Sequence, residues 1–518
     1  MSGEKSVDVE KINNNEKGFE PAHIRSVISL ALFSFVFLGM EFFFDSGAAE
    51  FVDARSVLLY QSVILLTSAV GLFIYALIER YVGSKIKQII IITCPKVLRS
   101  FTSSDSKIKQ IIIITLNIVE VAALAAIILC SGKLILLYGI IFFIVCGVMG
   151  GRVYHDVSRD YTDRKHLTVI VGISYALGLL LQYINYNLID SVILRMVMFS
   201  LAIVALAVIL FLARDEYAEA EVDTYMVDER NKTDCKEKCD ETTPDSGSVA
   251  VALVMVVLLM TFIFSALDNV VTVVHAEGGA DVGQWPRLFL ALSGVAAGFL
   301  FDIKDQRFMN QMMYCVTVLS VIAMLIIEFG GAFIIGLIVF YLAAGFFVVY
   351  FTTGFINVSY GMHWSALWSG AGRAVNNIGA GIVGIISYML IDSPGIMVMS
   401  VVVILLLVLI SIAVFVLENL QKEQYRRYDE EKVTKSAENS NARVEVDFEC
   451  FADAHHLTGR EREVLQKLLV SDGSVQDIAD ELYISRASLY RHISSMNEKT
   501  GTKTRVGLIQ YYYGWHEE

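Results

Sequence analysis

Apolar residues occur along this chain in long runs separated by short polar stretches. A helix rises 1.5 Å per residue, so about 20 apolar residues cross a hydrocarbon layer about 30 Å thick. Runs of this length predict an all-α polytopic membrane bundle of about 12 transmembrane helices, six before a polar break and six after it. The predicted spans are 24–44, 57–78, 110–130, 134–151, 166–188, 191–213, 249–267, 287–303, 312–329, 332–356, 366–391 and 395–417.

The loop charges give this array an orientation. Basic residues favour cytoplasmic loops, and here they concentrate in alternate loops, whereas 45–55, 131–133 and 268–287 are poor in them. The basic loop residues are Arg80, Lys85, Lys87, Lys96, Arg99, Lys107 and Lys109 after the second span, Arg152, Arg159, Arg164 and Lys165 after the fourth, and Lys304 and Arg307 after the eighth. The pattern predicts an inner-membrane protein with both termini in the cytoplasm.

Composition agrees with a membrane location and argues against a soluble globular protein and a metal-binding protein. Only 18% of the residues are charged and the mean hydropathy is +0.58, against about 25% charge in soluble domains. About half of the net charge of −13 comes from 214–248, which is predicted to be an acidic cytoplasmic loop. The seven cysteines include one close pair, Cys235 and Cys239, which offers too few ligands for a metal. We predict no metal site and no cofactor.

Polar residues inside the spans are candidate ligand contacts, because placing them in lipid is costly. The eleventh span contains "WSALWSGAGRAVNNIGAGIVG" (364–384), in which Trp368, Gly372 and Asn376 share a helix face. The predicted ligand-binding residues are Glu41, Glu120, Trp368, Arg373, Asn376 and Asn377. Packing of small residues with polar contacts between helices is the open alternative. No phosphate-binding loop and no nucleophile with a base occurs in the sequence, so we do not expect an enzyme.

Two cytoplasmic loops carry similar charge patterns. "GFLFDIKDQRF" (298–308) and, less faithfully, "GLFIYALIERYVGSKIK" (71–87) lie at matching places in the two halves. An acid at a helix end that pairs with loop bases can hold two helices together. The first motif resembles the loop between spans 8 and 9 of the major facilitator superfamily. The resemblance covers about 24–417 and implies a transporter-like fold.

The composition changes at Glu418. The segment 418–456 is charged and free of glycine, and we expect it to prolong the last helix for a few turns and then form a linker. In the terminal segment, Thr458 with Glu461 and Ser474 with Asp477 begin two helices, and Ser485 caps a third over 486–500. Leu489, Ile493 and Met496 form its buried stripe, and a fourth helix follows Gly501.

Two short helices joined by a tight turn are the form in which a recognition helix enters the major groove. "LTGREREVL" (457–465), "IADELYIS" (478–485) and His492 resemble the LuxR-type helix-turn-helix, which implies a four-helix domain with its last helix as dimer surface. The predicted DNA-binding residues are Arg486, Ser488, Tyr490, Arg491, Ser495, Lys499, Lys503 and Arg505. By resemblance, Ser488, Tyr490 and Arg491 would face bases or nearby phosphates. Leu489, Tyr490 and Thr500 depart from the common pattern, which leaves the base preference open.

These observations predict a membrane-embedded one-component transcriptional regulator that senses a small molecule. The alternative is a secondary transporter with a regulatory DNA-binding tail, although the small number of acids within the spans favours the sensor. The partners are promoter DNA, a small-molecule ligand, the lipid bilayer and a second copy of the chain on DNA. The predicted domains are a cytoplasmic tail 1–23, a first membrane half 24–213, the acidic loop 214–248, a second half 249–417, the linker 418–456 and the helix-turn-helix domain 457–518.

Overall fold

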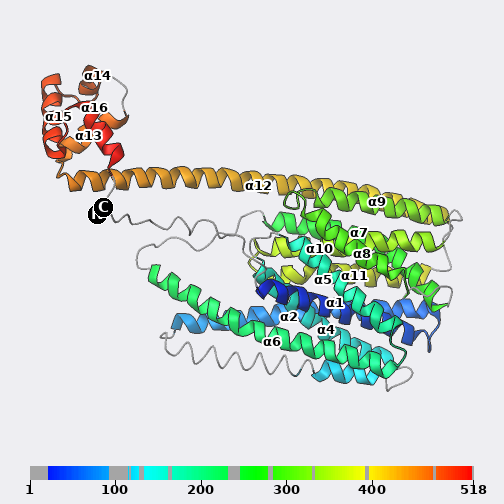
Figure 1. Cartoon of the computed structure of the whole chain (residues 1–518). Coiled ribbons are helices and arrows are strands. Elements are labelled where there is room, and N and C mark those ends of the chain that lie inside the picture. Colours follow the sequence, from blue (N-terminus) through cyan, green and yellow to red (C-terminus); the bar gives the residue numbers. More distant parts are fainter. Residues whose placement is uncertain are drawn as a thin grey trace, which may run out of the picture. The chain divides into compact units, whose positions relative to one another are not determined.

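The computed structural model describes residues 21–92, 115, 118–127, 134–161, 166–231, 246–277, 284–328, 333–390, 396–470 and 474–515. Within these ranges every regular element is a helix, which confirms the all-α class. The chain divides into two compact units, Met1–Lys422 and Glu423–Glu518, each with its own hydrophobic core (Figure 1). We call them the membrane unit and the terminal unit.

Helices occupy all twelve of the predicted spans, although only part of the third span lies within the described residues. Eight helices in the described ranges are long and apolar enough to cross a membrane, and the number of actual crossings stays a prediction. The helices are α1 (Pro21–Ala48), α2 (Ala54–Ile92), Ile118–Ile127, α4 (Ile135–Asp160), α5 (Leu167–Asn187), α6 (Val192–Asn231), α7 (Ser246–Ala276), α8 (Arg287–Asp302), α9 (Met309–Glu328), α10 (Phe333–Ser359), α11 (Ser365–Leu390) and α12 (Ile396–Ala454).

Helices α6, α7 and α12 are among those that extend well past the ends predicted from hydropathy. Helix α6 continues to Asn231 into the stretch predicted as the acidic loop, and α7 continues to Ala276. Helix α12 continues to Ala454, through the segment predicted to become a linker. None of these extensions contains glycine or proline, and two are rich in good helix formers such as Glu, Lys and Ala. The apolar runs therefore end where polar residues begin, but the helices continue through those polar residues.

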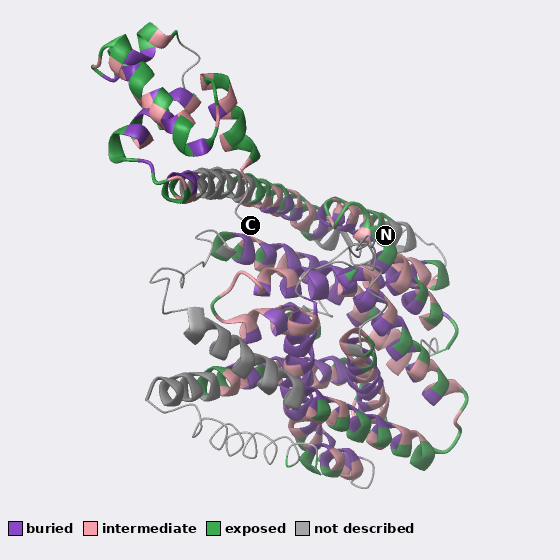
Figure 2. Ribbon diagram, turned by 60° about the vertical axis from the view of Figure 1, so that its left-hand side comes forward, coloured by how far each residue is buried: buried purple, intermediate pink, exposed green. Residues whose placement is uncertain are grey.

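The exterior of the membrane unit carries large apolar side chains. In a soluble protein such side chains would be buried, and contiguous exposed apolar surfaces mark contact with a partner or with lipid. Figure 2 shows buried residues on the interior faces of the bundle. The exposed apolar residues on α6 and α12 include Ile193, Val197, Leu201, Val204, Val208, Leu212, Ile404, Leu405, Val408, Ile412 and Phe415. These surfaces identify a multi-pass membrane protein.

Glycines allow two pairs of helices in the bundle to approach closely. A side chain at Gly147 of α4 would place its Cβ 2.1 Å from the carbonyl oxygen of Ser68 on α2. A side chain at Gly172 of α5 would lie 2.4 Å from the carbonyl oxygen of Gly294 on α8. Small residues promote such packing in lipid, where helices gain little from the hydrophobic effect. The α5–α8 pair joins the two six-helix halves.

The loop after α8 also joins the two halves, but by a contact that the sequence did not indicate. Asp302, at the end of α8, accepts hydrogen bonds from His166 Nδ1 at 2.8 Å and Thr168 Oγ1 at 3.1 Å. Both partners lie at the start of α5, whereas the motif suggested pairing with loop bases. The loop turns back through Lys304, Asp305 and Gln306, all with positive φ.

The terminal unit consists of the end of α12 and four short helices around one core. They are α13 (Gly459–Val470), α14 (Val475–Glu481), α15 (Arg486–Thr500) and α16 (Arg505–Gly514). The α15 bounds confirm the predicted third helix, since Ser485 caps its start and Gly501, at φ 70°, ends it. Phe448 and Phe451 of α12 are buried in the same core. The core therefore begins before the predicted start at 457.

Candidate functional site

The terminal unit contains two helices with the spacing of a helix-turn-helix. Ser474 and Asp477 form a complete capping box at the start of α14. The chain then turns through Leu482 and Tyr483, the latter at φ 55°, before Ser485 begins α15. Ile478 and Leu489 are fully buried between these helices and the rest of the core. Local capping and a shared core thus hold α15 against α14 with one face outward.

The outward face of α15 carries cationic and aromatic side chains. Arg486, Tyr490 and Arg491 are exposed and Ser488 is half-buried. Lys503 is exposed before α16, and Arg505, in its first turn, is half-buried. In the described part of the chain, no ion pair involves any of the four cations of this set, Arg486, Arg491, Lys503 and Arg505. Their charges are therefore available to phosphates.

Two other predicted DNA contacts, Ser495 and Lys499, form hydrogen bonds within the domain, with Lys499 exposed and Ser495 half-buried. Ser495 Oγ donates to Glu461 Oε1 at 2.7 Å, and Lys499 Nζ donates to Glu461 Oε2 at 2.6 Å. The same carboxylate accepts from the backbone N–H of Thr458 at 2.7 Å and from its hydroxyl at 2.8 Å. Burial raises the pKa of Glu461, but these four hydrogen bonds outweigh it and lower the pKa to about 2. That Ser495 and Lys499 contact DNA stays a prediction.

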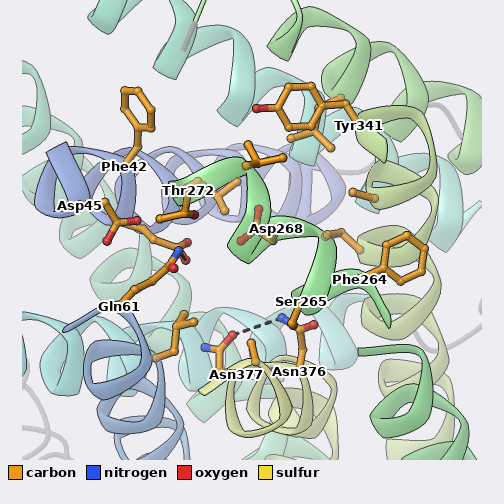
Figure 3. A pocket seen from close by; sticks show the side chains of 18 of the residues that line it. Phe42, Asp45, Gln61, Phe264, Ser265, Asp268, Thr272, Tyr341, Asn376 and Asn377 are labelled. Carbon is orange, nitrogen blue, oxygen red and sulfur yellow. Dashed lines mark hydrogen bonds between the residues drawn. The ribbon is translucent and has the colours of Figure 1, made fainter. Parts of the chain in front are cut away.

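A second candidate site is a polar cavity in the membrane unit. It has a volume of about 180 Å³ open to the centres of water molecules, which is room for several waters or a small organic molecule. Figure 3 shows Asp45, Gln61, Asp268, Asn376 and Asn377 around it. These side chains come from α1, α2, α7 and α11, so both halves of the bundle contribute. Phe42, Phe264 and Phe347 also line the cavity.

The cavity brings together four of the six ligand contacts predicted from sequence. Glu41, Arg373, Asn376 and Asn377 line it. Asn377 Nδ2 donates to Ser68 Oγ on α2 at 2.7 Å, so this amide also bridges two helices. Polar packing between helices therefore describes part of α11, and ligand contact by the residues that line the cavity stays a prediction.

Glu120 and Trp368 are not among the residues that line the cavity. Glu120 is buried, and its Oε2 has no hydrogen-bond partner among the described residues. Trp368 stacks on Phe355 with ring centroids 6.5 Å apart. Gly372, on the same face, packs so closely that a Cβ would lie 2.7 Å from the carbonyl oxygen of Phe351. That part of the α11 face serves helix packing.

Sequence reasoning missed several polar residues that line the cavity. Asp45 and Asp268 were assigned to loops, because they follow the last apolar residue of a run. In the structure α1 extends to Ala48 and α7 to Ala276, so both acids lie on helices and point into the bundle. Gln61 and Arg287 also line the cavity. One available signal was the spacing of Asp45 four residues after Glu41, which places both acids on one helix face.

Comparisons with known proteins agree with the two-unit description. Residues 455–512 match the family model of bacterial regulatory proteins, luxR family. The spore germination protein GerE of Bacillus subtilis (strain 168) is 49% identical over 53 residues, which are 10% of this chain and 70% of that protein. Through its terminal unit the chain belongs to the luxR family, and this unit is a LuxR-type DNA-binding domain of a transcription regulator.

The membrane unit is similar in fold to solved transporters. The human organic anion transporter MFSD10 (TETRAN) superposes with a TM-score of 0.50 at 12% identity, over 77% of this chain and 100% of that one. An auto-inhibited POT family peptide transporter gives a TM-score of 0.47 at 12% identity, over 79% of this chain and 97% of that one. The likeness to the first of these confirms a major-facilitator-like fold and nothing about its cargo. The chain therefore joins a transporter-like membrane unit to a DNA-binding domain.

Proposed function

We propose that this chain is a membrane-embedded one-component transcriptional regulator. A small molecule binds in the cavity of the membrane unit, and the bound state changes how the terminal unit occupies promoters. The observation that carries the proposal is the presence, in one chain, of a luxR-family domain and a transporter-like unit with a polar cavity. In this proposal the cavity receives the signal to which the attached DNA-binding domain responds.

Helix α12 is the proposed route by which a ligand bound in the membrane unit affects the terminal unit. It begins in the apolar run at Ile396 and ends at Ala454, after contributing Phe448 and Phe451 to the core of the terminal unit. A ligand can bias such a system only if it binds two states of the membrane unit with different affinity. A tenfold change in promoter affinity requires a coupling free energy of about 1.4 kcal/mol. That coupling is of the order found between sites in other regulated proteins.

In this proposal α15 reads the major groove. Arg491, Tyr490 and Ser488 face base edges or nearby phosphates, while Arg486, Lys503 and Arg505 bind phosphates and set the register. Ser495 and Lys499 act mainly within the domain by holding α15 to Glu461. Helix α16 forms the contact between two copies on DNA, as the family resemblance implies.

The proposal places the protein in the inner membrane with both termini in the cytoplasm. The support is the concentration of Lys and Arg in alternate loops. The location also meets a requirement of the function, since the terminal unit must reach the chromosome. Tagging the two termini and testing their accessibility in intact cells and in inverted vesicles checks it. Labelling of either tag in intact cells would contradict the assigned orientation.

A secondary transporter with a regulatory DNA-binding tail is the second candidate function. The transporter-like fold, with a cavity between the two halves, favours it. Purified protein in proteoliposomes separates the candidates: saturable flux of a bound ligand supports transport, and binding without flux supports a sensor.

The proposed function is tested by deletion. A chain lacking residues 1–420 should keep promoter binding but lose every response to the ligand. Target transcription is measured with a reporter in cells expressing the full chain or the deleted one. An unchanged ligand response in the deleted chain would overturn the proposal.

A further inference from the structure

The cavity of the membrane unit is lined by charges of both signs. Glu41, Asp45 and Asp268 supply carboxylates, and Arg287 and Arg373 supply guanidinium groups. Among the described residues, no ion pair within 4.0 Å joins any of these five. Charges kept out of bulk water are costly unless they are paired. Their separation in a built cavity indicates that something other than this chain completes the pairing.

The carboxylates gather around one part of the cavity. Glu41 and Asp45 lie on successive turns of α1, and Asp268 faces them from α7; Figure 3 shows Asp45, Gln61 and Asp268 bordering the same space. Asp45 is 9% exposed, and its Oδ1 has no hydrogen-bond partner among the described residues. Glu41 accepts one long hydrogen bond, from Gln61 Nε2 at 3.5 Å. An ammonium group, with three donors, would satisfy these oxygens.

A guanidinium group on α11 supplies the opposite charge. Arg373 is 6% exposed and lies against the faces of Phe37 and Phe351, at 5.1 and 5.2 Å. Its Nε donates to Tyr154 Oη at 3.4 Å, and in the described part of the chain no acceptor is recorded for its two terminal nitrogens. The terminal nitrogens of a guanidinium group have the geometry to donate two parallel hydrogen bonds to a carboxylate. Asn376, on the same helix, adds an amide to the cavity wall.

The geometry points to a small zwitterion as the ligand of this cavity, with its ammonium among Glu41, Asp45 and Asp268 and its carboxylate on Arg373. A simple anion would face three carboxylates, and a simple cation would provide no acceptor for the two terminal nitrogens of Arg373. The volume of about 180 Å³ gives room for a molecule of the size of an amino acid. This inference rests on the proposed function and names the ligand class of the same site.

The test compares ligands that differ in one charge. The full chain in lipid nanodiscs is titrated with leucine, leucinamide and isocaproate, and with γ-aminobutyrate, γ-aminobutyramide and butyrate, up to about 10 mM. Binding is read as thermal stabilisation and by calorimetry. We expect one zwitterion to bind and the loss of either charge to weaken binding by about tenfold or more. Equal binding of the acid or the amide would overturn the inference, and so would the absence of binding by any of the six.

Two variants assign the charges to the two ends of the ligand. In Arg373→Met the amide should bind as well as the zwitterion, and in Asp268→Asn, where two of the three carboxylates remain, the preference for the zwitterion over the acid should shrink. Asp190→Asn, an exposed acid outside the cavity lining, is the matched control and should keep the wild-type preference. If a variant does not fold, the ligand series on the wild-type chain still decides the matter.

The experiments distinguish a failure of the zwitterion inference from a failure of the proposed sensor function. A zwitterion that binds without changing promoter occupancy would reject the sensor and leave the ligand class standing. A ligand of single charge that binds and changes promoter occupancy would reject the zwitterion and leave the sensor standing.

Discussion

Replacing Glu461 with Gln should destabilise the terminal unit by about 2 kcal/mol at neutral pH. The side chain is buried, and it accepts hydrogen bonds from Thr458, Ser495 and Lys499. A carboxyl group whose pKa falls from 4.5 to about 2 gains at most about 3.4 kcal/mol, because each tenfold change is worth about 1.4 kcal/mol. Lys499 is partly exposed, so water screens part of this gain. Hydrogen bonds to a charged group of this kind contribute about 1.5–3 kcal/mol each, and glutamine retains some of them.

The pH dependence has a defined sign. Since the pKa of Glu461 is lowered on folding, its contribution is fully present above pH 4.5 and is lost as the pH falls toward about 2. Urea unfolding of the unit Glu423–Glu518 at pH 7 and at pH 3 measures it. The difference between wild type and Glu461→Gln should shrink at pH 3.

A control variant tests whether the loss of stability is specific to the buried carboxylate. Glu463→Gln removes an acid of the same helix whose ion pair with Arg460 is exposed, and it should cost less than about 1 kcal/mol. If Glu461→Gln cost no more than Glu463→Gln, or if its effect did not change with pH, the reasoning about the buried carboxylate would be wrong.

Three further predictions concern other parts of the chain. Arg491→Ala should weaken promoter binding by about 1–3 kcal/mol in a fluorescence titration, whereas Lys467→Ala, a cation on α13, should not; equal losses would remove Arg491 from the DNA surface. Gly147→Ala should lower the melting temperature of the membrane unit, because its Cβ would lie 2.1 Å from the Ser68 carbonyl oxygen; Gly247→Ala, with nothing within 4 Å, should not. Replacing 434–439 of α12 by a glycine-serine segment should abolish the ligand response in a reporter assay and leave DNA affinity intact, while an alanine segment of equal length should keep both; a retained response with glycine and serine would exclude α12 as the route.

The terminal unit was predictable because its signals are local. Ser485 before the third helix and Gly501 after it mark the ends that the structure shows. The buried stripe of Leu489, Ile493 and Met496 follows from helical spacing alone. Helical spacing placed Ser495 and Lys499 on the outward face of α15, but spacing on one helix could not show that a carboxylate on another helix accepts hydrogen bonds from both. Their hydrogen bonds to Glu461 depend on how α13 crosses α15.

The membrane unit was predictable in its apolar runs and not in its polar interior. A hydropathy window ends a span at an acid, so Asp45 and Asp268 fell into loops although both lie on helices. Whether a polar side chain in a membrane helix faces water, a cavity or another helix depends on the packing of the whole bundle. For this reason the sequence could not show that Arg373 and Asn376 line a common cavity while Glu120 and Trp368, predicted with them as ligand contacts, lie outside its lining.

The most direct test of the account measures promoter affinity of the full chain in nanodiscs with and without a ligand that binds the cavity. The same titration is made with the unit Glu423–Glu518 alone. The account predicts that the ligand changes the dissociation constant of the full chain by about fivefold or more, which is about 1 kcal/mol of coupling, and leaves that of the isolated unit unchanged. The same affinity of the full chain in the absence and presence of saturating ligand would contradict the account.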